Sequence, residues 1–196
     1  MSFEFDPVTH RYRLDGVTIP GISFVLENTG FIDKSWFKPE HAERGHAVHA
    51  ACQFLIEGNL DWSTVHPDIL PRVKAFEQFL CGTRPRLLLA EEPLYSKAWM
   101  FGGTPDIVLD MHGVPAVIDI KTGKAGLAAQ LQTAAQSILI FERKGITDAH
   151  RYALELSKGG SLRMVRHGNH GDRAMFLNAL AMIHRRINEK ELSLEK

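Results

Sequence analysis

Gly103-Thr104-Pro105-Asp106 and Ile118-Asp119-Ile120-Lys121-Thr122-Gly123 are the two stretches that decide the fold of this chain. Each of them lies at the end of an apolar run. Phe101 to Leu109 predicts one strand and Val114 to Ile120 the next, with a turn signal at His112-Gly113 between them. Paired as a hairpin, the start of the first strand meets the end of the second. The sequence therefore predicts that the polar groups of both stretches share one small volume.

Asp106, Asp119 and Lys121 are the charged side chains that such a hairpin brings together. Successive side chains of a strand point to opposite faces, so Asp119 and Lys121 share one face while Ile118 and Ile120 lie on the other. A solvated face would make this a surface ion pair of small consequence. The apolar neighbours instead predict a buried strand, where a charge without a partner is costly. Two close carboxylates repel each other unless a cation lies between them, and hard oxygen ligands suit Mg²⁺ or Mn²⁺.

One metal ion or two at Asp106 and Asp119, with the backbone carbonyl of Ile120 available as a further ligand, can cut a phosphodiester bond. Such an ion binds phosphate oxygens, activates a water molecule and stabilises the leaving oxygen. Lys121 beside the metal can position or deprotonate that water, or stabilise charge in the transition state. These residues supply the minimum set for cleaving a phosphodiester.

Length and composition favour one globular domain over residues 1–196. Of the 196 residues, 44% are hydrophobic and 23% are charged, and the formal net charge is +0. This balance argues against a non-specific polyanion binder but is compatible with local phosphate recognition. The two cysteines, Cys52 and Cys81, cannot form a zinc site or a Cys-ligated cluster. Because the sequence shows no signal peptide and no long apolar run, we expect a cytoplasmic protein that does not span a membrane.

Hydrophobic spacing predicts an α/β fold with a central mixed β-sheet flanked by helices. Residues 3–20 predict an N-terminal hairpin with a turn at Asp15-Gly16, and residues 39–80 predict a helical segment. The core is expected over residues 86–188. In it, a strand from Leu87 to Glu92 precedes the central hairpin, and a helix rich in Ala and Gln follows it.

The Gly-Thr-Pro-Asp and Ile-Asp-Ile-Lys-Thr-Gly stretches resemble the core motif of the PD-(D/E)XK nuclease superfamily. They are most similar to its RecB-like and phage lambda-exonuclease-like branches, and the resemblance implies a restriction-endonuclease-like core. Glu43-Arg44-Gly45-His46-Ala47-Val48-His49 resembles the Gly-x-x-x-His helix motif of RecB-like nucleases. In that resemblance His49 corresponds to the metal-proximal histidine, and Glu91 to an acidic residue that some branches use as another ligand.

Gln132 resembles the polar residue of the family's Gln-x-x-x-Tyr helix motif, and the sequence departs from that motif because Gln136 stands where Tyr is usual. Each supporting residue also has a structural alternative. His49 can be a helix histidine hydrogen-bonded to a neighbour. Glu91 and Glu92 alternate along a strand, so only one of them can face the site, and the motif position favours Glu91.

The resemblance implies a metal-dependent deoxyribonuclease, and in particular an exonuclease of phage or prophage origin that acts in DNA recombination or repair. The ligands that it implies for Mg²⁺ or Mn²⁺ are His49, Glu91, Asp106 and Asp119. Lys121 would orient or activate water, and Gln132 would position substrate or water. The partners implied are DNA, further copies of this chain in a homo-oligomer, and a phage recombination protein.

Three alternatives stay open at this point. The first is an endonuclease with the same site, the second is a non-catalytic DNA-binding module that retains the fold, and the third is a structural protein of a phage particle. Trp36, Phe37 and Trp99 are candidates for stacking on nucleic-acid bases, although core or rim packing is the commoner use of such residues.

Overall fold

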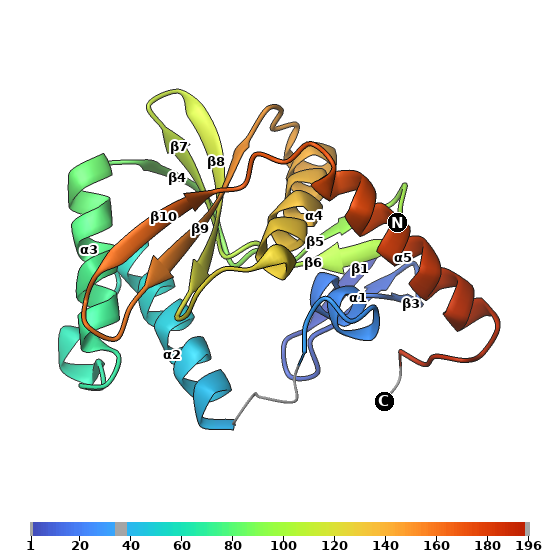
Figure 1. Cartoon of the computed structure of the whole chain (residues 1–196), viewed down its shortest axis with the longest axis horizontal. Helices are drawn as coiled ribbons and strands as arrows, with labels where there is room; N and C mark the ends of the chain where they lie inside the picture. Colours follow the sequence, from blue (N-terminus) through green and yellow to red (C-terminus); the bar gives the residue numbers. More distant parts are fainter. Residues whose placement is uncertain (1, 34–38, 195–196) are drawn as a thin grey trace.

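The computed structural model describes residues 2–33 and 39–194 and shows an α/β fold around a mixed five-stranded sheet (Figure 1). The strands of this sheet are β4 (Arg86–Ala90), β7 (Ile107–Met111), β8 (Val114–Lys121), β9 (His150–Leu156) and β10 (Leu162–Arg166). Their order is β10-β9-β8-β7-β4, and all neighbours are antiparallel except β8 and β9. The α/β fold with a mixed sheet flanked by helices, predicted from the sequence, is therefore confirmed.

Helices cover both faces of the sheet. The α-helices in the described residues are α1 (Ile22–Asn28), α2 (Pro39–Ile56), α3 (Leu70–Thr83), α4 (Leu127–Lys144) and α5 (Asp172–Asn188), with a short 3-10 helix at Trp62–Thr64. One core joins α2 and α3 to one face, and a second core joins α1, α4 and α5 to the other. Ile107 and Leu109 of β7 enter the first core whereas Val108 enters the second, as side-chain alternation along a strand requires.

The predicted central hairpin is confirmed. Ile107 of β7 pairs with Ile118 of β8, and the hairpin closes at His112-Gly113. Both turn residues have positive φ, at 59° and 91°, which is the backbone that a two-residue turn between twisted strands requires. From the end of β8 the chain crosses over through α4 and returns as β9, parallel to β8.

The prediction of one strand from Phe101 to Leu109 is wrong. Phe101–Gly103 forms β6, which pairs with β5 (Leu94–Ser96) in a separate two-stranded sheet, and only then does the chain enter β7. The break falls at Thr104-Pro105-Asp106. Proline donates no backbone hydrogen bond and restricts the residue before it, so the ladder cannot run through this point. Asp106 therefore lies between the two sheets, immediately before the first residue of β7.

The N-terminal segment has one strand more than the predicted hairpin. It is a three-stranded antiparallel sheet of β1 (Phe3–Asp6), β2 (Arg11–Leu14) and β3 (Val17–Ile19). The predicted turn at Asp15-Gly16 is confirmed, with both residues at positive φ. The extra turn forms because the Asp6 carboxylate accepts hydrogen bonds from the backbone N–H groups of Val8 and Thr9.

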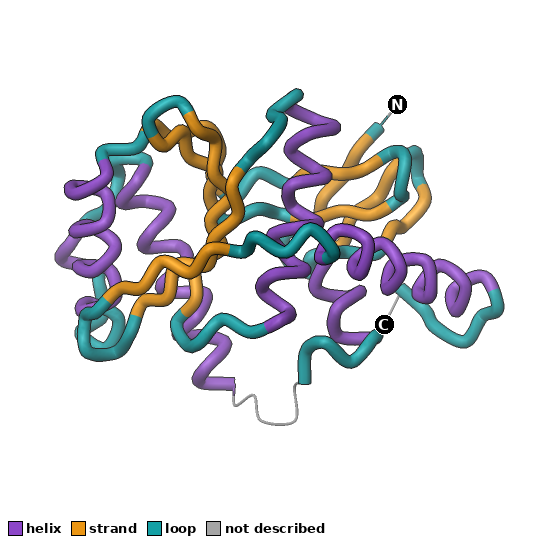
Figure 2. The backbone as a smooth tube through the Cα atoms, turned by 45° about the horizontal axis from the view of Figure 1, so that its top comes forward, coloured by secondary structure: helices purple, strands orange, loops and turns teal. Residues whose placement is uncertain are grey.

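Helix α4 lies between this N-terminal part and the large sheet. It contacts β5 and β6 on one side and β8 and β9 on the other. Figure 2 shows α4 as the purple helix between two groups of orange strands. No helix in residues 2–33 or 39–194 is both long and apolar enough to cross a membrane.

Close packing at Gly102 predicts a measurable loss of stability in Gly102→Ala. A Cβ atom at Gly102 of β6 would clash with the ring of Tyr12, which is buried. We expect the free energy of unfolding to fall by about 1–3 kcal/mol, because a packed core accommodates extra atoms only by strain. Urea unfolding measures this change. Gly168→Ala is the control, since a Cβ atom there meets nothing within 4 Å, and equal losses in the two variants would contradict the packing at β6.

Candidate metal centre

Three strand ends meet at one end of the large sheet. Glu91 follows the last residue of β4, Asp106 precedes the first residue of β7, and Asp119 lies near the end of β8. The pairing of β4 with β7 and of β7 with β8 places these ends next to one another. Two hydrogen bonds fix them locally: the Glu91 N–H donates to the Asp106 carbonyl at 3.0 Å, and the Ile120 N–H donates to the Asp106 carboxylate at 2.6 Å.

Glu91 faces this point because β4 stops one residue before it. The predicted strand from Leu87 to Glu92 ends at Ala90, and Glu91 has a φ of 45° in the left-handed region. Glu92 instead pairs with Lys144 on α4, at 2.7 and 2.9 Å. Of the two adjacent glutamates, the structure thus brings Glu91 to the strand ends.

His49 reaches the same point from α2. Its Nδ1 atom lies 3.4 Å from Asp106 Oδ2 and 3.9 Å from Glu91 Oε1. One ligand atom from each of His49, Glu91 and Asp106 falls within 4.8 Å of the others, so the three side chains can hold a metal ion. Two carboxylates and one imidazole form a donor set in which the oxygens favour a hard cation.

Asp119 lies beside this group rather than within it. Its side chain is 0% exposed, and Lys121 Nζ lies 2.8 Å from Oδ2. Apart from this ion pair, neither carboxylate oxygen has a hydrogen-bond partner among the described residues. A fully buried carboxylate without hydrogen bonds is costly unless a positive charge compensates for it. The Lys121 ammonium compensates for the charge at Oδ2, and the Oδ1 atom, which has no partner among the described residues, fits a site that receives a further cation.

The Lys121 ammonium is held from a second side by α4. It donates a hydrogen bond to Gln132 Oε1 at 3.1 Å. Gln132 is thereby directed at the site, because its oxygen points to the same ammonium that faces Asp119. The sequence had placed Asp119 and Lys121 on one strand face, and the structure puts that face against α4.

Burial and repulsion between the carboxylates raise the pKa values of two of the three acidic groups. Burial, with repulsion from Asp106, raises the pKa of Glu91 to about 7. Burial is also the main cause that raises the pKa of Asp119 to about 6. The charge of Lys121 lowers this pKa, but it offsets only part of the combined effect of burial and of the Asp106 charge. Burial acts in the same direction on Asp106, but the attraction of His49 outweighs it, so the pKa of Asp106 is lowered.

The two basic groups balance these carboxylates. Burial opposes protonation of His49, but the charge of Asp106, its hydrogen bond and the charge of Asp119 prevail and raise the pKa of His49 to about 9. Burial likewise lowers the pKa of Lys121, but the attraction of Asp119 and Asp106 outweighs burial, so the pKa is raised overall. Without a metal ion, the site therefore compensates its negative charge with a protonated histidine and a lysine.

Most of the residues singled out in the sequence thus lie at one place in the structure. His49, Glu91 and Asp106 form the possible ligand set, with Asp119, Lys121 and Gln132 next to it. The part of the Ile120 carbonyl as a ligand stays a prediction. Among the aromatic candidates, Trp99 is 43% exposed and hydrogen-bonded through its carbonyl to His184, while Trp36 and Phe37 lie outside the described residues.

Sequence reasoning missed the contact that holds the Thr-Pro-Asp break in place. The Tyr12 hydroxyl and Thr104 Oγ1 lie 3.0 Å apart and share a hydrogen bond. Tyr12 comes from the N-terminal sheet, 92 residues earlier in the chain. No local pattern signals such a pair, because the two residues meet only when the N-terminal sheet packs on β6.

A scan against protein-family models and a search of curated proteins each found no match for this chain. The chemistry of the site is therefore inferred from its own side chains, their distances and their charges. On these grounds the cluster is a candidate metal centre at the end of a mixed sheet.

The raised pKa values predict that metal binding releases protons. Histidine and carboxylate ligands bind metal only when deprotonated, and His49 and Glu91 have pKa values of about 9 and about 7 in the metal-free protein. Mn²⁺ affinity should rise from about pH 6 to about pH 8, with close to one proton released per ion at the upper end and more at the lower. Calorimetry in buffers of different ionisation enthalpy counts these protons. Binding without proton release would exclude His49 as a ligand.

Adjacent glutamates give a matched test of the ligand set. Glu91→Gln should lower the affinity for Mn²⁺ by about 10- to 100-fold or more, because an amide replaces a charged oxygen ligand. Glu92→Gln makes the same substitution one residue away and breaks only an exposed pair with Lys144, so its affinity should equal that of the unmodified protein. Titration calorimetry on both variants measures the difference. Equal affinities in Glu91→Gln and Glu92→Gln would remove Glu91 from the site.

Proposed function

We propose that this protein is a metal-dependent nuclease of the PD-(D/E)XK type that hydrolyses phosphodiester bonds of DNA. The observation that carries the proposal is the group of His49, Glu91 and Asp106 beside the buried Asp119 carboxylate, which pairs with Lys121 through Oδ2 and has no partner at Oδ1 in the described residues. Such an arrangement is costly for folding, and a catalytic metal ion with Lys121 beside it gives it a use.

The residues present fit Mg²⁺ or Mn²⁺. His49, Glu91 and Asp106 would hold the ion, and Asp119 and the Ile120 carbonyl are the further ligands that the sequence suggests. When bound, the metal supplies a Lewis acid for the phosphate oxygens and lowers the pKa of a coordinated water molecule. Harder carboxylate oxygens outnumber the single imidazole, which favours these two ions over softer metals.

The position of Lys121 suits it to stabilise negative charge during the reaction. In the metal-free protein its ammonium is protonated, because Asp119 and Asp106 raise its pKa, and in this state it acts as a hydrogen-bond donor. Placed between Asp119 and Gln132, it can orient a water molecule by hydrogen bonding and attract the negative charge that develops on the phosphate. Gln132 accepts a hydrogen bond from Lys121 and so holds the ammonium in this direction.

Within this chemistry we favour an exonuclease of phage or prophage origin that acts in DNA recombination or repair in the cytoplasm of a bacterial host. The support for this finer assignment is the resemblance of the Gly-Thr-Pro-Asp and Ile-Asp-Ile-Lys motifs to the phage lambda-exonuclease-like branch. The same resemblance suggests a homo-oligomer and a phage recombination protein as a partner. An endonuclease with the same side chains is the alternative that the cleavage assay below separates.

Lys121→Ala tests the proposal. We expect the variant to retain Mn²⁺ binding but to lose cleavage by about 10²- to 10³-fold, the usual cost of removing one group that stabilises charge in a transition state. The assay uses end-labelled linear DNA and closed circular DNA with Mg²⁺, Mn²⁺ or EDTA. Loss of linear DNA alone indicates an exonuclease, and nicking of the circle indicates an endonuclease.

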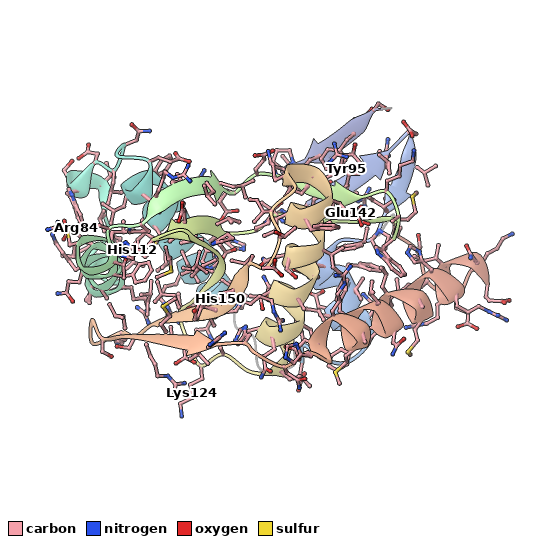
Figure 3. The ribbon with its side chains drawn as sticks, turned by 90° about the horizontal axis from the view of Figure 1, so that it is seen from above. Arg84, Tyr95, His112, Lys124, Glu142 and His150 are labelled. Atoms are coloured by element: carbon pink, nitrogen blue, oxygen red, sulfur yellow. The ribbon has the colours of Figure 1, made fainter. Side chains whose placement is uncertain are left out.

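Lys124→Ala is the matched control. Lys124 lies in the loop after β8, is exposed and points away from the sheet (Figure 3). Its removal changes the net charge as Lys121→Ala does, so a general weakening of DNA binding would affect both variants alike. The nuclease proposal fails if the unmodified protein cleaves no substrate, and the role of Lys121 fails if Lys121→Ala cleaves as well as Lys124→Ala.

A further inference from the structure

A cavity of about 400 Å³ opens directly beside the candidate metal centre. Its walls come from the N-terminal sheet, from α1, from the end of β6, from α4 and from Leu194 after α5, parts of the chain that meet only in the folded protein. Thr104 and Gln132 belong both to this wall and to the surroundings of the metal centre, so a ligand that spans the two places passes these side chains. The volume is at the lower end of the range for small-molecule sites and suits one nucleotide.

Gln136 is the residue that indicates what the cavity takes. It lies one helical turn after Gln132 on α4, it lines the cavity, and only 1% of its surface is exposed. Neither its amide oxygen nor its amide nitrogen has a hydrogen-bond partner in residues 2–33 and 39–194. A buried amide in this state can pair with a group from outside the chain, and a ligand edge with one donor and one acceptor side by side would satisfy both of its atoms.

The edge of a nucleobase is such a partner. Each base presents neighbouring donors and acceptors, and glutamine pairs with such edges through both amide atoms. Because a half-turn of the amide exchanges its oxygen and nitrogen, Gln136 can match either order of donor and acceptor. Phe24 and His10, which also line the cavity, offer rings on which a base can stack.

We propose that this cavity holds the terminal nucleotide of a DNA strand, with the base against Gln136 and the phosphate toward Thr104 and Gln132. The inference rests on the nuclease function proposed above and names its substrate as a strand end. One nucleotide fills the volume, which favours an end over a continuous strand. Recognition through one rotatable amide and stacking makes the pocket tolerant of the base identity.

The test is calorimetric titration of the full chain, in Mn²⁺ and again in EDTA, with deoxyadenosine 5′-monophosphate, its 3′-isomer and deoxyribose 5-phosphate. We expect one of the two nucleotides to bind about tenfold or more tightly than the sugar phosphate, since base stacking and pairing add to the phosphate contact. Gln136→Leu should reduce this base-dependent gain by about tenfold. Gln130→Leu is the control, because Gln130 lies on the same helix outside the cavity and should keep the gain.

Equal binding of both nucleotides and of the sugar phosphate to the unmodified protein would overturn the proposal, and this comparison needs no variant to fold. Unchanged base-dependent binding in a folded Gln136→Leu protein, checked by circular dichroism, would also overturn it. Failure of the two proposals is distinguishable. Base-dependent binding without DNA cleavage retains the pocket and removes the nuclease, whereas cleavage without base-dependent binding removes only the pocket.

Discussion

The hydrogen bond from the Ile120 N–H to the Asp106 carboxylate is the interaction on which the site depends. It exists because Pro105 interrupts the run of apolar residues from Phe101, so that β6 and β7 belong to different sheets and Asp106 lies between them, immediately before β7. A carboxylate at this break can bind the end of β8 on one side and approach His49 on the other. The break therefore ties the strand ends to α2 and sets the distances within the cluster.

Charge balance is the second constraint on this region. Three carboxylates lie close together where water is largely excluded, and each raises the cost of ionising the others. His49 and Lys121 offset this negative charge. His49 lies on α2, which precedes the sheet in the sequence, whereas Lys121 lies on β8 itself. A cluster of this kind contributes little to folding stability as it stands, and this is the physical basis of the metal-dependent function proposed above.

The strand pairing and the charges on it were predictable from local sequence. Alternation along Val114 to Ile120 placed Asp119 and Lys121 on one face, and the His112-Gly113 turn set the register that brings Asp106 near them. The strand break at Pro105 was not predicted, because the apolar residues on both sides of it have the same character. The third N-terminal strand was missed for a similar reason, since it depends on how the Asp6 side chain binds the following turn.

By itself the sequence determined the α/β fold class, the central hairpin and the acidic and basic residue types at its ends, since all of these follow from short-range periodicity and turn chemistry. Only the tertiary structure decided that Glu91 rather than Glu92 meets Asp106, that Tyr12 holds Thr104, and that Gln136 is buried without a partner beside a cavity. These features join parts of the chain that are far apart in sequence. Their geometry follows from how α2, α4 and the N-terminal sheet pack around the strand ends, which no local pattern encodes.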